Sequence, residues 1–231
     1  MDELYRRLLV PDDLVFDVGA LVGGRLACFR RLGCRVVAVE PQAAPLALFC
    51  LLHGLRRNRE VTIEACALGA EAGEVVLLVN PLNPAVSTAS PAFVRAAADA
   101  PGWRRQRWRG RVRVPLSTLD RLIARHGAPA FAKVDVEGYE AEVLAGLSRP
   151  LPALSFEFTT IRRPVARACL ERLASLGPYR FNAALGESQR LVFAEPLDAE
   201  ACAAWLDRLP AEVNSGDVYA SLEPQRLRGE G

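Results

Sequence analysis

The stretch that decides the fold is Val15-Phe16-Asp17-Val18-Gly19-Ala20-Leu21-Val22-Gly23. An apolar run ends at Val18, and two glycines four residues apart follow it at once. Apolar, β-branched residues bounded by glycine are typical of a buried strand that leads through a tight turn into a helix. We therefore predict a first strand over 14–18 and a helix near 24–32.

On either side of this stretch, extended and helical patterns alternate. Further strands are predicted at 36–40, 61–65, 74–79, 112–114, 131–136, 153–158, 179–183 and 190–194. Further helices are predicted at 44–55, 117–125, 140–147, 165–176 and 198–209. Such alternation predicts an α/β fold, with a mostly parallel sheet and helices on both faces.

Three regions depart from the alternation. The closely spaced runs 179–183 and 190–194 predict an antiparallel strand pair that closes one edge of the sheet. Segment 80–110, rich in Pro, Ala and Arg, is expected to be an irregular loop or a lid over the acceptor. Segment 211–231 is expected to be a C-terminal tail. We expect residues 1–231 to form one domain.

Composition excludes several classes of protein. A net charge of +2 points to neither a polyanionic nor an acidic partner, and Lys133 is the only lysine among 29 basic residues. No apolar run approaches the ~18 residues of a membrane span, so a soluble protein without a membrane partner is expected. Residues 1–7 place acids before bases, unlike a secretory signal, which favours a cytoplasmic protein. Six scattered cysteines without a C-x-x-C pair predict free thiols.

The first two predicted strands each carry an acid at or near the carboxyl end. Asp17 lies inside the first strand, and a single glycine, Gly19, occupies the turn, unlike the dinucleotide fingerprint G-x-G-x-x-G. A carboxylate there repels a pyrophosphate but favours positive charge, such as the sulfonium and amino groups of S-adenosylmethionine. Glu40 ends the second strand near the offset at which an acid binds both hydroxyls of a ribose. Together the two acids predict an adenosyl cofactor without a pyrophosphate.

Motifs of other nucleotide-binding and hydrolytic enzymes are missing. The chain has no G-K-S or G-K-T of a phosphate-binding loop and no tyrosine followed four residues later by lysine. Neither H-E-x-x-H nor G-x-S-x-G occurs, which excludes the usual zinc peptidase and α/β-hydrolase motifs.

A second group of acids follows the strand at 131–136, in Lys133-Val134-Asp135-Val136-Glu137-Gly138-Tyr139-Glu140. Asp135 and Glu137 should face the same cleft as Gly19, and Glu157 ends the next strand at the same edge. A buried Glu157 needs a partner, and Lys133 is available. Either Glu137 or Glu140 could instead stabilise the N-terminus of the following helix.

Methyl transfer to an oxygen requires a base or a metal at the acceptor hydroxyl. His53 and His126 each follow a predicted helix and precede a strand, which places both at the amino edge, away from the cofactor. We therefore predict Asp135 as the main catalytic residue. Glu137 and Glu157 join it as candidates for substrate contact or for ligands of a metal such as Mg²⁺.

Several motifs together resemble the FkbM family of methyltransferases. They are V-F-D-V-G-A from Val15, A-V-E-P at 38–41, A-L-G at 67–69, S-T-L-D at 117–120, K-V-D-V-E-G-Y-E at 133–140 and the ending at 215–220. The resemblance implies a Rossmann-like class I methyltransferase sheet, S-adenosylmethionine as donor, and O-methylation. The implied acceptor is a hydroxyl of a small molecule, such as a sugar, a glycan or a polyketide-type natural product.

The resemblance also implies roles for individual residues. The methionine part of the cofactor would lie against Asp17, Gly19, Ala20 and Gly23, and the ribose against Glu40 and Pro41. Cys66, Ala67 and Leu68 would form the adenine edge, with Ser87 and Asp135 beside the site. The family commonly has asparagine where this chain has Leu21, a departure that puts one polar contact in question.

Two other functions stay open. Six arginines interleave with Trp103 and Trp108 over 103–113, a pattern that can hold phosphates and stack bases, as an RNA or protein methyltransferase would require. Against RNA, D-V-E-G stands where enzymes that methylate base amino groups often carry N-P-P-Y, and a nucleic-acid partner is not expected. Because of Leu21, a cofactor-binding homologue without turnover is the second alternative. The sequence does not decide whether the chain forms a homodimer.

Overall fold

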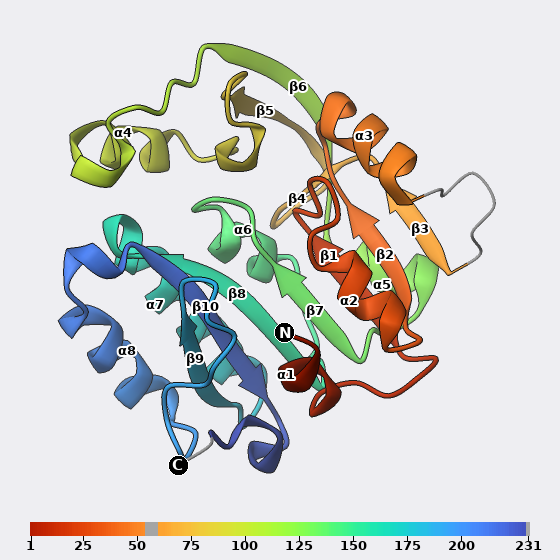
Figure 1. The fold of residues 1–231 in the computed structure, drawn as a ribbon, viewed down its shortest axis with the longest axis vertical. Coiled ribbons are helices and arrows are strands. Elements are labelled where there is room, and N and C mark those ends of the chain that lie inside the picture. The colour runs from red at the N-terminus through yellow and green to blue at the C-terminus, as the bar shows by residue number, and fades with distance from the viewer. Residues whose placement is uncertain (54–59, 230–231) are drawn as a thin grey trace.

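The first predicted strand lies at the centre of a seven-stranded sheet in the computed structural model, which describes residues 1–53 and 60–229. The strand order is β3-β2-β1-β7-β8-β10-β9 (Figure 1). The strands are β1 (Leu14–Val18), β2 (Arg35–Val39), β3 (Val61–Glu64), β7 (Phe131–Val134), β8 (Ala153–Thr159), β9 (Arg180–Leu185) and β10 (Ser215–Ser221). The parallel strands of this sheet are β3, β2, β1, β7 and β8, whereas β10 is antiparallel to both β8 and β9. The predicted sheet, mostly parallel with an antiparallel pair at one edge, is confirmed.

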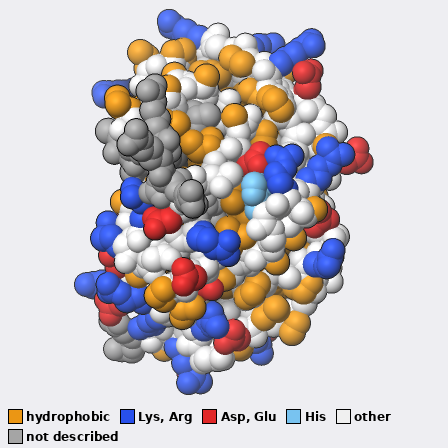
Figure 2. All heavy atoms as spheres, turned by 90° about the vertical axis from the view of Figure 1, so that its right-hand side faces the viewer, with side chains coloured by type: hydrophobic (Ala, Val, Ile, Leu, Met, Phe, Trp, Pro, Cys, Tyr) orange, Lys and Arg blue, Asp and Glu red, His pale blue; other side chains and the backbone are white. Residues whose placement is uncertain are grey.

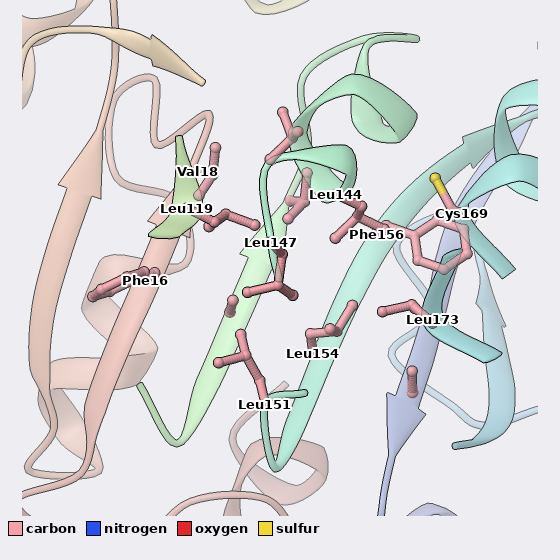
Figure 3. Close-up of a cluster of buried hydrophobic side chains, with 14 of the residues drawn as sticks. Phe16, Val18, Leu119, Leu144, Leu147, Leu151, Leu154, Phe156, Cys169 and Leu173 are labelled. Carbon is pink, nitrogen blue, oxygen red and sulfur yellow. The ribbon is translucent and has the colours of Figure 1, made fainter. Parts of the chain in front are cut away.

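Helices cover both faces of this sheet, as predicted. They are α1 (Asp2–Arg6), α2 (Leu26–Arg31), α3 (Ala43–His53), α4 (Pro91–Asp99), α5 (Leu119–His126), α6 (Glu140–Ala145), α7 (Arg163–Leu176) and α8 (Ala199–Arg208). One face packs against α5, α6, α7 and α8 through a cluster that includes Phe16, Phe156 and Leu173 (Figure 3). The other face packs against α1 and α2, where Tyr5 and Phe29 lie edge to face.

A smaller, three-stranded sheet has two of its strands in a lobe, which we define as residues 73–117. Its strands are β4 (Ala67–Leu68), β5 (Gly73–Val79) and β6 (Gly110–Ser117), in the order β4-β6-β5. Between β5 and β6 lie α4 and the 3-10 turns η2 (Pro84–Val86) and η3 (Pro101–Trp103). The expectation of an irregular segment over 80–110 is therefore wrong for 91–99. Ser90 accepts a hydrogen bond from the Phe93 N–H, and Pro91 occupies the first helical position, so a helix start was present in the sequence.

The antiparallel pair has a different second strand from the one predicted. Run 190–194 lies outside the strands, and the pair is formed by β9 and β10, the latter within the expected tail 211–231. Glycine and aspartate have low strand propensity, so the sequence pattern did not predict β10. Gly216 is required there, since a Cβ would lie 2.4 Å from the Ala184 carbonyl oxygen. The remaining turns are η4 (Thr160–Arg162), η5 (Ala211–Val213) and η6 (Pro224–Leu227).

Two further sequence expectations concern membranes and cysteines. Across the described ranges, no helix has the length and apolar character to cross a membrane. All six cysteines are free, as predicted, and five of them are buried.

The strand assignment makes a direct prediction about stability. Val218 of β10 is fully buried, whereas Val192 of the run predicted as a strand is 42% exposed. Val218→Asp should lower the free energy of unfolding by more than about 4 kcal/mol, because it buries an unpaired charge. Val192→Asp, the control, should change it by less than about 0.5 kcal/mol. Urea denaturation measures both, and equal losses would contradict the assignment.

Candidate active site

The order of the chain reverses between β1 and β7, because β2 and β3 lie on one side and β8 on the other. In such sheets ligands bind at the carboxyl ends of the strands beside this switch point. A hollow of about 550 Å³ lies there. The predicted site residues that line it are Gly19, Glu40, Pro41, Cys66, Ala67, Leu68, Ser87, Asp135 and Glu137. The sequence therefore predicted residues that the fold brings together.

The turn after β1 joins three strands closely. Gly19 has φ of +85°, and a Cβ on it would lie 1.8 Å from the carbonyl oxygen of Asp135. The N–H groups of Gly19 and Ala20 both donate to the carbonyl of Val39, at 3.0 and 3.1 Å. Gly23 donates to Ala20 at 2.7 Å and closes the turn. Gly19 thus lines the pocket, while Ala20 and Gly23 shape the turn without lining it.

Glu40 is held by backbone donors at the pocket wall. Its Oε2 accepts the N–H of Leu21 at 3.0 Å, and its Oε1 accepts the N–H of Gln42 at 2.8 Å. Burial raises the pKa of Glu40, and these two N–H groups oppose the rise. The carboxylate is therefore fixed in one orientation. Leu21 keeps its backbone contact to Glu40 although its side chain differs from the asparagine common in the family.

Asp17 lies beneath the pocket and does not line it. It is buried, stands beside Lys133 in the strand register, and leaves its Oδ2 without a hydrogen-bond partner. Burial raises the pKa of Asp17 to about 6, with Lys133 opposing the rise. Its predicted contact with the methionine part of the cofactor stays a prediction.

Three acids meet where β7 and β8 end. One carboxylate oxygen from each of Asp135, Glu137 and Glu157 lies within 4.8 Å of the others. Lys133 Nζ lies 2.6 Å from Asp135 Oδ2 and 3.7 Å from Asp217 Oδ1. The expected pairing of Lys133 with Glu157 is therefore wrong. The reason is that residues i and i+2 along a strand share a face of the sheet. Lys133 therefore contacts Asp135, two residues further on, and not Glu157 of the neighbouring strand.

The three acids hold their protons differently. Burial raises the pKa of Asp135, but the charge and hydrogen bond of Lys133 outweigh it, so the pKa is lowered. Burial and the charge of Asp135 raise the pKa of Glu137 and of Glu157 well above the usual value. One ionised carboxylate thus stands beside two carboxyls that retain their protons to higher pH, a pattern typical of catalytic sites.

The loop after β7 is strained where it turns toward the pocket. Glu137 has φ of +58°, which is uncommon for a residue other than glycine, and its carbonyl accepts the Thr88 hydroxyl at 2.7 Å. Glu140 Oε1 accepts the N–H groups of Val136 and Gly138, at 3.0 and 3.1 Å. Glu140 therefore fixes the loop that precedes α6, whereas the alternative role considered for it was at the N-terminus of that helix; Glu137 lines the pocket.

Sequence reasoning missed other pocket residues, including Leu77, Ala85, Ala89 and Tyr139. Gln42 also lines the pocket, and its Nε2 donates to the Pro84 carbonyl at 3.2 Å, which joins the loop after β2 to the lobe. Residues in loops and in the lobe follow no regular sequence pattern, so such contacts cannot be predicted from the sequence.

The histidines lie elsewhere. His126 does not line the pocket; it lies edge-on to Phe16 and 2.6 Å from Glu64, at the end of β3. Its partner Glu64 is the last residue of β3, and neither side chain lines the pocket. The side chain of His53 lies outside the described residues.

In the stretch 103–113, the tryptophans and the arginines differ in their burial. Trp103 is buried, Trp108 is half-buried, and both rings lie edge to face against Phe93. Their Nε1 atoms donate to Asn214 Oδ1 and to the Val86 carbonyl, at 2.8 and 2.7 Å. The arginines of the lobe are therefore exposed to solvent, whereas the two tryptophan rings pack within the protein.

Leu21 provides a test of backbone strain in the site. Its φ is +48°, in the left-handed region that costs most residues about 1–2 kcal/mol and that asparagine tolerates. Leu21→Asn should raise the free energy of unfolding by about 1 kcal/mol relative to Leu21→Ala, the control that keeps a strained Cβ. Urea denaturation of both variants checks this, and equal stabilities would contradict it.

Glu140 provides a test by pH. Burial raises its pKa from 4.5 to about 7, so the folded protein holds the proton to higher pH than the unfolded chain does. Its contribution to stability is therefore complete at low pH and falls between about 4.5 and 7. Glu140→Gln, which stays neutral, should match the parent at pH 4.5 and exceed it by roughly 3 kcal/mol above pH 7. Exposed Glu142→Gln should show no such trend in denaturation at several pH values, and a flat Glu140→Gln difference would refute the assignment.

Comparison with known proteins places this site in a family. The sequence profile described as the methyltransferase FkbM domain matches residues 17–170. A comparison with curated proteins gave no significant match.

Solved structures of low identity were also found. A precorrin-6Y C5,15-methyltransferase from Geobacter metallireducens is 12% identical, with 94% of this chain and 84% of that chain covered and a TM-score of 0.49. An rRNA methylase from Streptococcus thermophilus is 12% identical, with coverages of 95% and 92% and a TM-score of 0.46. A geranyl diphosphate C-methyltransferase from Streptomyces coelicolor is 13% identical, with coverages of 96% and 77% and a TM-score of 0.43.

The family profile spans most of the chain, including the end of β1, the turn at Gly19, Glu40 and the three clustered acids. The chain belongs to the FkbM family and is an S-adenosylmethionine-dependent methyltransferase.

Proposed function

We propose that this enzyme is an O-methyltransferase whose acceptor is a hydroxyl of a small molecule, such as a sugar, a glycan or a polyketide-type natural product. One observation carries the proposal: Asp135 lies at the pocket wall, 2.6 Å from the Lys133 ammonium, which lowers its pKa, and close to Glu137 and Glu157, whose pKa values are raised by burial. A hydroxyl must lose its proton as it attacks, so it needs a base, whereas a neutral amine attacks with its lone pair. The acids therefore support an oxygen acceptor.

The pocket fits the cofactor by its shape and donor set. S-adenosylmethionine supplies an electrophilic methyl group on a sulfonium. The fixed carboxylate of Glu40 would accept hydrogen bonds from the ribose hydroxyls, and the apolar wall of Cys66, Ala67 and Leu68 would contact the adenine. Gly19 leaves room for a close approach, since it has no Cβ.

Asp135 is the proposed base. Lys133 keeps this carboxylate ionised at neutral pH, so it is available to accept the proton from the acceptor hydroxyl. Protonated Glu137 and Glu157 would donate hydrogen bonds that hold Asp135 or the acceptor oxygen in line for attack. Glu137, which lines the pocket, would contact the substrate, whereas Glu157, which does not line it, would act through Asp135 and Glu137.

The same three acids are the place where Mg²⁺ would bind. Mg²⁺ prefers ionised carboxylate oxygens, so its binding would displace the protons of Glu137 and Glu157; one oxygen from each of the three acids lies within 4.8 Å of the others. Bound there, the ion would polarise the acceptor hydroxyl. Calorimetric titration with Mg²⁺ of the parent protein and of Glu157→Gln tests the site, and identical titrations would remove the metal from the proposal.

The test of function separates cofactor binding from turnover. Asp135→Asn should lower formation of S-adenosylhomocysteine by at least about 100-fold against a panel of sugar and polyol acceptors. Calorimetry should show its affinity for S-adenosylmethionine within about threefold of the parent, since Glu40 and the adenine wall are intact. Glu40→Gln should do the reverse and weaken binding by about tenfold or more. Unchanged turnover in Asp135→Asn would remove it as the base, and a parent protein that binds neither cofactor form would refute the assignment of the pocket.

A further inference from the structure

The lobe carries a concentration of positive charge that the proposed chemistry does not use. Seven arginines and a single acid, Asp99, lie between residues 95 and 113, although the whole chain has a net charge of only +2. We call these seven the lobe arginines: Arg95, Arg104, Arg105, Arg107, Arg109, Arg111 and Arg113. The rest of the molecule is therefore net acidic. In Figure 2 the upper end of the molecule, which holds the lobe, carries basic side chains at its margin, whereas acidic and basic ones are intermingled lower down.

The lobe arginines share one feature, which is that none of them lies beside a carboxylate of the described residues, whereas a subset of the arginines elsewhere does. Outside the lobe, seven arginines lie within 4.0 Å of a carboxylate: Arg25, Arg31, Arg125, Arg167, Arg180, Arg226 and Arg228. Within the described residues, none of the lobe arginines has such a partner. Unpaired like charges repel, so their concentration here indicates an anionic ligand.

Two of these arginines border a groove. The groove is an open hollow of about 970 Å³ lined by Val94, Ala98, Arg104, Gln106, Arg107 and Trp108. Arg107 Nη1 donates to the backbone carbonyls of Arg104 and Gln106, at 2.6 and 2.8 Å. These contacts orient its guanidinium without neutralising it. The groove therefore has polar, positively charged edges and an apolar wall from α4.

The groove and the cofactor pocket lie on two sides of one loop. Ala85 and Ser87 line the pocket, while the carbonyl of Val86 between them accepts the Trp108 Nε1–H at 2.7 Å. Gln106 Oε1 accepts a hydrogen bond from Asn80 Nδ2 at 2.8 Å, and the Asn80 N–H donates to Ser87 Oγ at 3.2 Å. A molecule bound in the groove is thus next to the wall of the active site.

We propose that this groove binds the phosphate or diphosphate group of the methyl acceptor, with Arg104 and Arg107 as the binding residues. Guanidinium groups bind phosphate oxygens bidentately, which suits a small phosphorylated ligand. The acids of the pocket repel such a group, so we place it in the groove, outside the pocket. Resting on the proposed function, this makes the acceptor a diphosphate-linked sugar, carried by either a nucleoside or a lipid.

The test is calorimetric binding of three probes: inorganic pyrophosphate, uridine diphosphate and farnesyl diphosphate. The Arg104→Gln/Arg107→Gln variant should bind the best probe at least about tenfold more weakly than the parent. Arg149→Gln is the control, because Arg149 is exposed and lies at the amino edge of the sheet; it should stay within about twofold. Raising NaCl from about 50 to about 200 mM should weaken binding to the parent.

The outcomes separate the sources of the phosphate. Tighter binding of uridine diphosphate supports a nucleotide-linked acceptor, tighter binding of farnesyl diphosphate supports a lipid-linked one, and equal binding of all three supports recognition of the diphosphate alone. No binding, or equal binding by parent and double variant, would overturn the proposal. An RNA 20-mer that binds more tightly than all three probes would also overturn it.

The same proteins are titrated with S-adenosylmethionine, whose affinity should be equal in parent and double variant. A parent that binds diphosphate but not this cofactor would contradict the proposed function and leave the groove assigned. Both substituted side chains are exposed, so circular dichroism should show an unchanged fold.

Discussion

The ammonium of Lys133 is the charge on which the rest of the site depends. It lies 2.6 Å from Asp135 and 3.7 Å from Asp217, and Arg25 lies 3.7 Å from the other oxygen of Asp217 and 2.9 Å from exposed Glu187. Acids and bases thus alternate from the surface to the pocket. Removing one member of such a buried series leaves an uncompensated charge, which costs several kcal/mol. Lys133 is also the only lysine in a chain that otherwise uses arginine, and a compact ammonium suits this position because it needs less space than a guanidinium.

This interaction connects the C-terminal strand to the chemistry. Asp217 reaches Lys133 because β10 lies next to β8, which is itself next to β7. The lysine in turn separates the acids by their pKa values: it lowers the pKa of Asp135, whereas burial and the charge of Asp135 raise the pKa of Glu137 and of Glu157. Without the lysine, Asp135 would lose the adjacent positive charge that favours its ionisation over that of the two neighbouring carboxyls. The base of the proposed reaction is therefore selected by a residue that does not line the pocket.

Local patterns were enough to predict the central sheet and much of the site. The strand ends at Asp17, Glu40 and Asp135 follow from apolar runs that stop at an acid, and parallel strands bring their carboxyl ends to one edge. What failed depends on contacts between distant residues. Strand β10 contains Gly216 and Asp217, which are poor strand formers in isolation; the close Ala184 backbone requires the glycine, and Lys133 and Arg25 neutralise the aspartate.

Other misses have equally physical causes. The pairing of Lys133 with Asp135 instead of Glu157 depends on which side chains share a face of the sheet. The start of α4 at Ser90-Pro91 was present in the sequence, but the surrounding alanines, prolines and arginines obscured it. The strain at Leu21 and Glu137 has no sequence signal, because both residues are of types that seldom adopt positive φ.

The most direct test of the central claim is a crystal structure of the protein with S-adenosylhomocysteine. The account predicts the ligand at the carboxyl ends of β1 and β2, with its ribose hydroxyls on the Glu40 carboxylate, its adenine along Cys66 to Leu68, and its sulfur on the side of Asp135. A ligand bound elsewhere, or one whose ribose does not contact Glu40, would contradict the account.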